Sequence, residues 1–218
     1  MKILVLGGCG TQGRTAIVDL LSDPDVEQVI CGDIDFKPLE KIAPFIPGDK
    51  LTRVKLDASD HGKLVPLFRA VDVVIDLLPV EFQDAICNIA LEAETSIVHT
   101  NYTYAATVLD EAAKRAGISI MPECGLDPGI DLVLYGRARK KFDELVSILS
   151  YCGGFPEKSA CDNPLNYKLS WIWSTVLSST MRESQIIRDS RLVHIPTEQQ
   201  HDKEFVHTID FPGLGELE

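Results

Sequence analysis

Short apolar runs alternate with amphipathic stretches through the first 121 residues of the chain. The apolar runs predict buried strands, and the stretches between them predict helices. The predicted strands are Lys2–Leu6, Gln28–Gly32, Arg53–Leu56, Val71–Leu77, Ser96–His99 and Ser119–Met121. The predicted helices are Gln12–Ser22, Pro38–Phe45, His61–Ala70, Glu81–Ala93 and Ala105–Ala116. Alternation with short connections predicts an α/β fold, a doubly wound parallel sheet covered on both faces.

The pattern changes after Met121. A loop rich in glycine and proline comes first, and the stretch Ile130–Phe142 predicts a helix. Alternating residues then predict the strands 145–152, 167–171 and 204–209, and a four-residue connection, 188–191, predicts a hairpin. We therefore expect two domains, residues 1–124 and 125–218, the second an α+β domain with an antiparallel sheet.

Three glycines, Gly8, Gly10 and Gly13, follow the first predicted strand with the spacing GxGxxG. In a Rossmann-type dinucleotide site the first glycine permits a sharp turn, the second lets the backbone approach a pyrophosphate, and the third lets the helix lie against the strand. The residues between them, Cys9, Thr11 and Gln12, belong to the same turn and helix start. The alternative is a turn with a structural role only, but the strand before it and the helix after it favour dinucleotide binding.

Asp33 follows Gly13 by 20 positions, at the end of the second predicted strand. A carboxylate at this place accepts hydrogen bonds from both ribose hydroxyls of the adenosine half, whereas a 2′-phosphate would meet a like charge. This interpretation predicts NAD as the cofactor in preference to NADP. Asp35 is a competing candidate, although capping of the following helix explains it more simply.

Residues that follow the other strands are further candidates, because ligands bind at the carboxyl ends of parallel strands. Asp57 and Ala58 either flank the adenine or form the cap region of the next helix. Leu78 and Pro79 either form a backbone ledge beside the nicotinamide ribose or only end the strand. Tyr102 follows the fifth strand, where we expect it to contact the substrate.

Composition excludes several classes of partner. The formal charge is −12 and hydrophobic residues make up 45% of the chain, so a folded protein without nucleic-acid or anionic-membrane contacts is expected. Six cysteines without CxxC pairs indicate reduced thiols and a cytoplasmic location. No leader-like or membrane-spanning apolar run is present, and the five histidines lack metal-ligand spacing, so no metal is expected.

Three blocks of sequence carry a resemblance to a known family. ECGLDPGID at 123–131, YCGGFP at 151–156 and DNPLNYKLSW at 162–171 resemble the saccharopine dehydrogenase family, which includes lysine 6-dehydrogenases and carboxynorspermidine dehydrogenases. With the glycine motif, the resemblance covers nearly the whole chain. The chain departs from the family at Ser190, where a glycine is common, and the family continues beyond a point resembling FPGLGELE. The resemblance thus implies that the second region is a partial substrate and dimerisation domain.

The resemblance implies oxidation of a CH–NH or CH–NH2 group in an amino acid such as saccharopine or lysine, or the reverse reduction of an imine. Such chemistry needs a hydride acceptor and a base for the amine proton. Glu123 and Asp127 are the carboxylates nearest to the expected nicotinamide position, and with Tyr102 they form the candidate catalytic group. Alternatively, Asp127 only forms an Asx turn before Pro128.

Two residues of the second region are candidates for substrate binding. Lys168 is a candidate partner for a substrate carboxylate, and its alternative is a solvated lysine. Trp171 is a candidate substrate contact, although a tryptophan in a strand more often serves sheet packing than substrate stacking.

The leading hypothesis is an NAD-dependent amino-acid dehydrogenase, and the rival is a catalytically silent dinucleotide-binding module. A second domain with too few strands leaves an open edge and an uncovered apolar face. We therefore expect a homodimer that pairs through residues 145–215.

Overall fold

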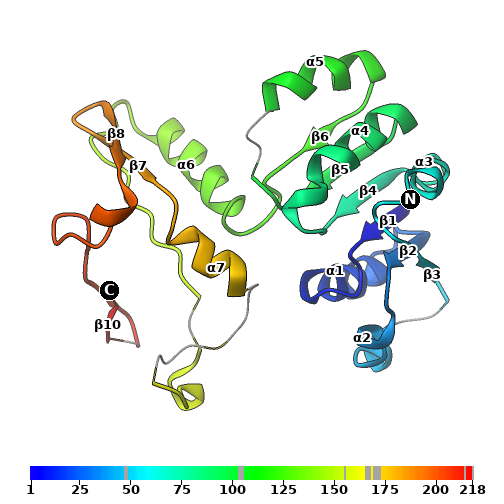
Figure 1. Cartoon of the computed structure of the whole chain (residues 1–218), viewed down its shortest axis with the longest axis horizontal. Helices are drawn as coiled ribbons and strands as arrows, with labels where there is room; N and C mark the ends of the chain where they lie inside the picture. The colour runs from blue at the N-terminus through cyan, green and yellow to red at the C-terminus, as the bar shows by residue number, and fades with distance from the viewer. Residues whose placement is uncertain are drawn as a thin grey trace. The chain divides into compact units, whose positions relative to one another are not determined.

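The computed structural model describes residues 1–46, 49–102, 106–154, 156–164, 168, 173–213 and 215–217. The chain divides into two compact units, Met1–Ser150 and Tyr151–Glu218 (Figure 1). Each unit is considered by itself.

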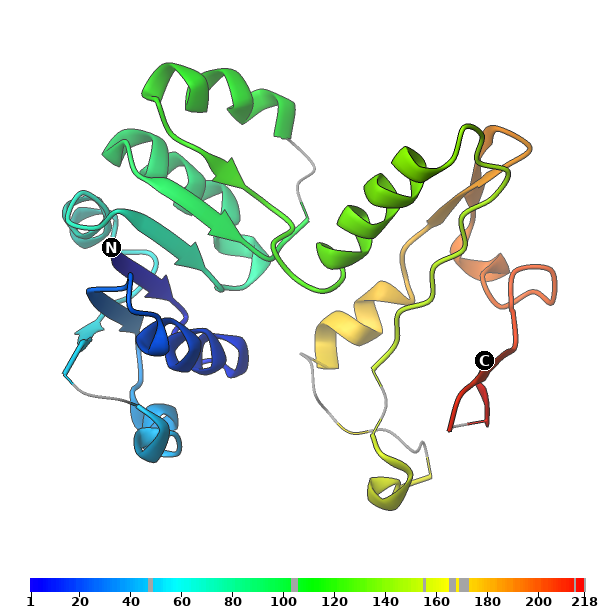
Figure 2. The same ribbon diagram turned by 180° about the vertical axis from the view of Figure 1, so that it is seen from behind.

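The first unit is built on a six-stranded sheet with the order β3-β2-β1-β4-β5-β6, seen from two sides in Figures 1 and 2. Its strands are β1 (Lys2–Leu6), β2 (Gln28–Asp33), β3 (Leu51–Lys55), β4 (Val73–Asp76), β5 (Ser96–His99) and β6 (Ile120–Met121). Every neighbouring pair is parallel. This is the strand order of a Rossmann-type sheet, so the predicted fold class is confirmed.

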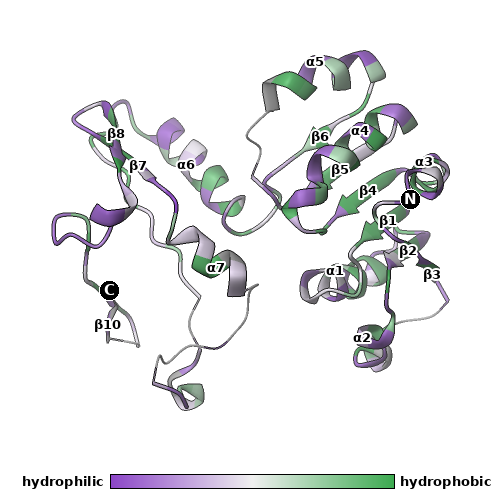
Figure 3. Cartoon of the chain, viewed as in Figure 1, coloured by the Kyte–Doolittle hydropathy of each residue, from purple (hydrophilic) through white to green (hydrophobic). Residues whose placement is uncertain are grey.

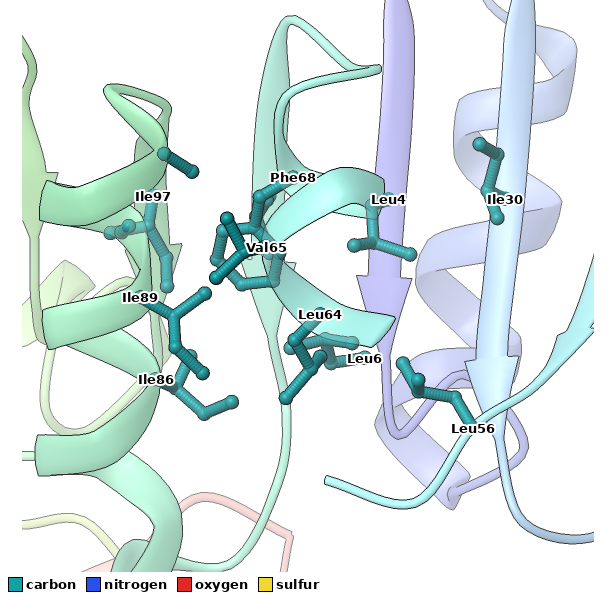
Figure 4. Close-up of a cluster of buried hydrophobic side chains, with 13 residues drawn as sticks. Leu4, Leu6, Ile30, Leu56, Leu64, Val65, Phe68, Ile86, Ile89 and Ile97 are labelled. Atoms are coloured by element: carbon teal, nitrogen blue, oxygen red, sulfur yellow. The ribbon is translucent and has the colours of Figure 1, made fainter. Parts of the chain in front are cut away.

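Helices cover both faces of this sheet. On one face, α1 (Thr11–Ser22) and α2 (Lys37–Glu40) close a core that contains Ile17 and Leu39. On the other face, α3 (His61–Phe68) and α4 (Gln83–Ala93) close the core drawn in Figure 4. The fifth helix, α5 (Ala106–Ala116), contacts α4 and β6. The predicted helix 38–45 divides into α2 and the short 3-10 helix η1 (Ala43–Phe45), and a second 3-10 helix, η2 (Val80–Phe82), precedes α4.

The chain leaves the sheet after β6 and forms α6 (Ile130–Lys141), as predicted. Every residue of α6 is at least partly exposed, including the apolar Val133 and Leu134, and Figure 3 shows apolar positions along this helix. The predicted strand 145–152 is wrong, because this segment has no regular structure and its Val146 is exposed. An alternating run forms a strand only beside a partner, and no described segment pairs with this one.

The second unit contains two small antiparallel sheets. The hairpin of β7 (Ser184–Arg188) and β8 (Arg191–Ile195) is confirmed, with a two-residue connection because Arg188 pairs with Arg191. The other sheet pairs β9 (Ile209–Phe211) with β10 (Gly215–Leu217), so the predicted strand 204–209 is wrong except at Ile209. The predicted strand 167–171 lies outside the described residues except for Lys168.

Short helices complete the second unit. They are η3 (Lys158–Ala160), α7 (Trp173–Ser179) and η4 (Thr197–Gln199). Among the helices of the described residues, none has both the length and the apolar content needed to cross a bilayer.

We expect Phe68→Ala to lower the free energy of unfolding by roughly 3–5 kcal/mol, because the ring is fully buried between α3 and the sheet. Urea denaturation of the full chain measures this change. Phe45→Ala is the matched control, since that ring is 67% exposed and its loss should cost less than about 0.5 kcal/mol. Equal losses in the two variants would contradict the assigned core.

Candidate functional site at the carboxyl ends of the parallel strands

The glycine turn brings the start of α1 against the end of β1. Gly7 has a φ of +69°, a conformation that side chains disfavour. A Cβ on Gly13 would lie 2.3 Å from the Gly7 carbonyl oxygen, and a Cβ on Gly8 would lie 2.6 Å from the Cys31 Sγ. The sharp turn therefore depends on Gly7, which the motif spacing missed although the Gly7-Gly8 doublet signals it, and Gly8 is needed for close packing.

Gly10 differs from these glycines because a Cβ there would have one neighbour within 4 Å, the Gly7 carbonyl oxygen at 3.1 Å. It is the N-cap of α1 and provides no side-chain cap for the first N–H groups of the helix. Thr11 and Gln12 are exposed in this first turn. The turn thus presents unhindered backbone N–H groups and the positive end of a helix dipole, which suit a phosphate.

Asp33 ends β2 beside this turn, and backbone N–H groups donate hydrogen bonds to both of its carboxylate oxygens. Oδ2 accepts a hydrogen bond from the Cys9 N–H (2.9 Å), and Oδ1 accepts from the N–H of Ile34 (2.7 Å) and of Asp35 (3.3 Å). The side chain therefore fixes the glycine turn to β2. Its register partner on β3 is the exposed Lys55. Side chains of register partners leave the same face of a sheet, so an anion near Asp33 also meets a cation.

Asp57 and Ala58 follow β3 in a locally bonded turn. The Asp57 carboxylate accepts hydrogen bonds from the Ser59 N–H (2.9 Å) and Oγ–H (2.6 Å), and these bonds lower its pKa. The cap of α3 is Asp60, which accepts from the Lys63 N–H. The structure places Asp57 and Ala58 at the carboxyl edge of the sheet; contact with adenine stays a prediction.

The turns after β4 and β5 are bonded to each other. The Leu78 N–H donates to the Asp76 Oδ1 (3.0 Å), and the Leu78 carbonyl accepts from the Asn101 Nδ2 (3.4 Å). Pro79 follows as the exposed N-cap residue of η2. Asp76 and Asn101 thus set the position of Leu78, and Asp76 was not among the residues predicted from the sequence; a ledge of Leu78 and Pro79 beside the nicotinamide ribose stays a prediction.

The structure brings the candidate catalytic residues into one neighbourhood. The Tyr102 hydroxyl donates to the Asp127 Oδ1 (3.3 Å), and both side chains are exposed. The Glu123 N–H donates to the Asn101 carbonyl (3.2 Å), and the Cys124 N–H donates to the His99 carbonyl (2.9 Å). The loop that carries Glu123 and Asp127 is therefore bonded to the end of β5.

The same loop is closed on itself at Gly129. The Ile130 N–H donates to the Gly125 carbonyl, and a Cβ on Gly129 would lie 2.0 Å from that oxygen. Gly129 has a φ of +148°, and the Asp127–Pro128 peptide bond is cis. This compact turn presents the Asp127 carboxylate outward rather than into a local Asx turn.

Lys168 lies in the second unit, where its Nζ contacts both Asp162 carboxylate oxygens at 2.7 Å. Both side chains are substantially exposed, so a substrate carboxylate would compete with a neighbouring aspartate. Trp171 lies outside the described residues. In the part of the chain that the structure describes, no three histidine, cysteine or acidic side chains gather as they would around a metal ion.

Two family models match the chain. The saccharopine dehydrogenase NADP-binding domain matches residues 3–121, and the saccharopine dehydrogenase C-terminal domain matches residues 125–218.

Relatives with known names match most of the chain. A saccharopine dehydrogenase [NADP(+), L-glutamate-forming] from Pyricularia oryzae is 32% identical over 89% of this chain and 43% of its own length. The enzyme of the same name from Saccharomyces cerevisiae is 37% identical over 90% of this chain and 44% of its own length. The apo structure of saccharopine dehydrogenase (L-Glu forming) from Saccharomyces cerevisiae superimposes with a TM-score of 0.73 at 29% identity, over 90% of this chain and 44% of that one. The chain therefore spans less than half the length of these relatives.

The expected preference for NAD over NADP is wrong. The matching domain model is an NADP-binding domain, and both saccharopine dehydrogenases named above carry NADP(+) in their names. The Asp33 argument assumed a carboxylate that is free for ribose, whereas its oxygens accept hydrogen bonds from three backbone N–H groups. An acidic residue at this position therefore does not by itself exclude a 2′-phosphate.

The fold, the open glycine turn and the family matches agree along nearly the whole chain. The first unit has the parallel sheet of a dinucleotide-binding domain, and the NADP-binding model covers residues 3–121 of it. This chain belongs to the saccharopine dehydrogenase family.

Proposed function

We propose that this chain binds NADP and takes part in oxidising the C–N bond of saccharopine or a similar amino acid. The observation that carries the proposal is the placement of the Tyr102–Asp127 pair at the sheet edge that also carries the open glycine turn. Ligands of such sheets lie across the carboxyl ends of the strands. The named relatives are L-glutamate-forming saccharopine dehydrogenases, which supports this substrate class.

The glycine turn fits the dinucleotide because the space beside Gly10 is open and the first N–H groups of α1 face it. When bound, NADP supplies the acceptor for a hydride from the carbon beside the secondary amine. In this proposal Thr11 and Gln12 hold the pyrophosphate through their backbone. Leu78 and Pro79 support the nicotinamide ribose, and Asp57 and Ala58 flank the adenine.

In this proposal the proton transfers involve Tyr102, Glu123 and Asp127. Loss of a hydride leaves an imine, so the amine nitrogen must also lose its proton to a base, and water must then attack the imine carbon to release glutamate and an aldehyde. The Asp127 carboxylate is exposed and accepts one hydrogen bond from Tyr102, so it retains oxygen lone pairs for the amine proton. Glu123 is the alternative base. Lys168 stays a candidate partner for a substrate carboxylate, and Trp171 stays a candidate substrate contact.

In this proposal two lysine side chains bind the 2′-phosphate of NADP. Lys55 is the register partner of Asp33, and Lys37 follows two residues after Asp35, whose Oδ1 accepts the Lys37 N–H at 3.0 Å. Charge-assisted hydrogen bonds from lysine favour a phosphate even beside an acidic residue.

A second candidate function is a dinucleotide-binding module without turnover that pairs as a homodimer through residues 145–215. Exposed apolar side chains within this range, such as Val146, Leu149 and Ile187, favour this alternative, because such surfaces pack against a partner. Light scattering after size-exclusion chromatography tests the dimer. NADP binding without turnover of saccharopine or lysine would favour the silent module.

We expect Gly10→Val to abolish NADP binding and to lower the thermal midpoint of unfolding much less than Gly13→Val does. The valine would fill the space proposed for the pyrophosphate, and its Cβ would meet one protein atom, the Gly7 carbonyl oxygen at 3.1 Å. Calorimetric titration and thermal unfolding of the full chain measure the two effects. Gly13→Val is the matched control: its side chain would collide with the Gly7 carbonyl and the Gly8 backbone, so it should lower the midpoint as well. NADP affinity retained in Gly10→Val would refute the phosphate site.

We expect Lys55→Gln to weaken NADP binding about tenfold, the effect of losing one charge-assisted hydrogen bond, and to leave NAD binding unchanged. Titrations of both dinucleotides measure this. Lys2→Gln at the amino end of β1, away from the carboxyl edge of the sheet, serves as the control and should change neither affinity. A parallel loss of NAD affinity in Lys55→Gln would contradict a specific role at the 2′-phosphate.

Removing the proposed base should lower turnover more than substrate affinity. We expect Asp127→Asn to lower kcat by about 10²–10⁴-fold, the usual contribution of a general base. Tyr102→Phe should have a smaller effect, because it removes one hydrogen bond to that carboxylate. The rate of NADP reduction with saccharopine measures both. A large loss in Glu123→Gln with normal turnover in Asp127→Asn would transfer the role to Glu123.

A further inference from the structure

Arg14 follows the glycine motif directly, at the fourth position of α1, the helix that lies against β1 and β2 (Figure 1). Two successive carbonyl groups of the turn bind to it. The Arg14 N–H donates to the Gly10 carbonyl (3.0 Å), and the Arg14 Nη1 donates to the Cys9 carbonyl (2.8 Å). The second of these bonds is partly buried and charge-assisted, so it is stronger than a bond between neutral groups. Arg14 therefore engages the turn although it lies outside the GxGxxG spacing.

Charged side chains hold the backbone of Cys9 at both its N–H and its carbonyl. The N–H donates to the Asp33 carboxylate (2.9 Å), and the carbonyl accepts from the Arg14 guanidinium. The next N–H, that of Gly10, donates to the Gly7 carbonyl (3.0 Å). The peptide group between Cys9 and Gly10 is thus bonded at its oxygen and at its nitrogen, which fixes its orientation.

This orientation matters for an anion, because a carbonyl oxygen carries a partial negative charge and an N–H group a partial positive charge. A turn binds a phosphate when N–H groups point toward the anion and carbonyl groups point elsewhere. Arg14 engages the Cys9 and Gly10 carbonyls, and the N–H groups at the start of α1 have no side-chain cap. Loss of the guanidinium bond would free the Cys9 carbonyl to rotate, and a carbonyl oxygen turned toward a phosphate repels it.

We propose that Arg14 is a positioning residue, whose guanidinium holds the Cys9 carbonyl away from the cofactor and so keeps the glycine turn in the conformation that binds a pyrophosphate. Because Arg14 acts through the backbone, it contributes to the affinity for NADP and for NAD alike. This separates it from Lys55, which we place at the 2′-phosphate. The role toward the cofactor rests on the proposed NADP binding, whereas the hold on the turn does not.

Two other roles for Arg14 predict different results. A guanidinium that attracts the dinucleotide only by its charge would lose its effect at high salt, because salt screens exposed charges. A guanidinium that binds the 2′-phosphate would affect NADP and not NAD. A positioning residue changes both affinities by one factor at low and at high salt, because its partly buried bond is screened much less.

Titration of Arg14→Met with both dinucleotides tests these alternatives, because methionine keeps an unbranched side chain and removes every donor. We expect NADP and NAD binding each to weaken about tenfold, the effect of losing one charge-assisted hydrogen bond, at low and at high salt. Arg69→Met is the matched control. The Arg69 Nη2 donates to the Glu92 carbonyl (3.2 Å) at the end of α3, a bond of the same kind away from the glycine turn, so neither affinity should change. A loss confined to NADP, or one that disappears at high salt, would overturn the proposal.

Amide hydrogen exchange of the full chain without cofactor tests the hold on the turn. We expect Arg14→Met to speed exchange of the Cys9 and Gly10 N–H groups about tenfold, because their peptide groups lose a restraint. The Ile97 N–H, which donates to the Ser119 carbonyl (2.9 Å), should exchange at its original rate. Unchanged rates at Cys9 and Gly10, or an equal increase at Ile97, would overturn the proposal, the latter because it indicates a general loss of stability.

If Arg14→Met does not fold, Arg14→Gln, with a shorter polar side chain, takes its place in both experiments with the same expected changes. A chain that binds neither dinucleotide would refute the proposed function. In that case the exchange rates still decide whether Arg14 holds the turn.

Discussion

The close approach of α1 to the end of β1 is the constraint on which the candidate cofactor site depends. It holds only where the backbone has no Cβ, since one on Gly13 would lie 2.3 Å from the Gly7 carbonyl oxygen. Once the helix is at this distance, the Cys9 N–H reaches the Asp33 carboxylate and ties the turn to β2. The open space beside Gly10 and the first N–H groups of α1 follow from this packing. A phosphate site therefore arises from backbone geometry in a chain with a net charge of −12.

Most of the first unit could be predicted from sequence because its signals are local. Each buried strand is an apolar run, and each helix places its apolar residues on one face, as Ile17 and Leu21 do in α1. The glycine spacing identified the turn, although Gly7 carries the positive φ. The predicted preference for NAD over NADP was wrong. A sequence pattern does not show the hydrogen-bond partners of a carboxylate, and one partner of Asp33 is the N–H of Cys9, 24 positions away. Asp33 stands where a ribose ligand is expected, yet neighbouring backbone N–H groups occupy its oxygens.

The second region was harder to predict because alternation alone does not specify a strand. Segment 145–152 alternates but has no partner among the described residues, and only Ile209 of the predicted strand 204–209 is paired. The prediction of the hairpin was correct because its two strands are neighbours in the sequence. Asp189 and Ser190 adopt φ values of 51° and 60°, as a two-residue type I′ connection requires, so a glycine at position 190 is not needed. The candidate Lys168 likewise looked available in sequence, whereas Asp162 engages it in the structure.

Polar residues at and just after the ends of β4 and β5 hold the turns at the candidate catalytic edge of the sheet. Central strands of a parallel sheet are buried on both faces. A polar side chain at the last position of such a strand therefore needs a hydrogen-bond partner, and the backbone of the following turn can provide one. Asp76 does so through Leu78, and Asn101 joins that turn to its neighbour. The Glu123 N–H then donates to the Asn101 carbonyl, which extends the same network to the loop that carries Asp127. Tyr102 and Asp127 are exposed, but partly buried hydrogen bonds that no linear motif records hold the turns that carry them.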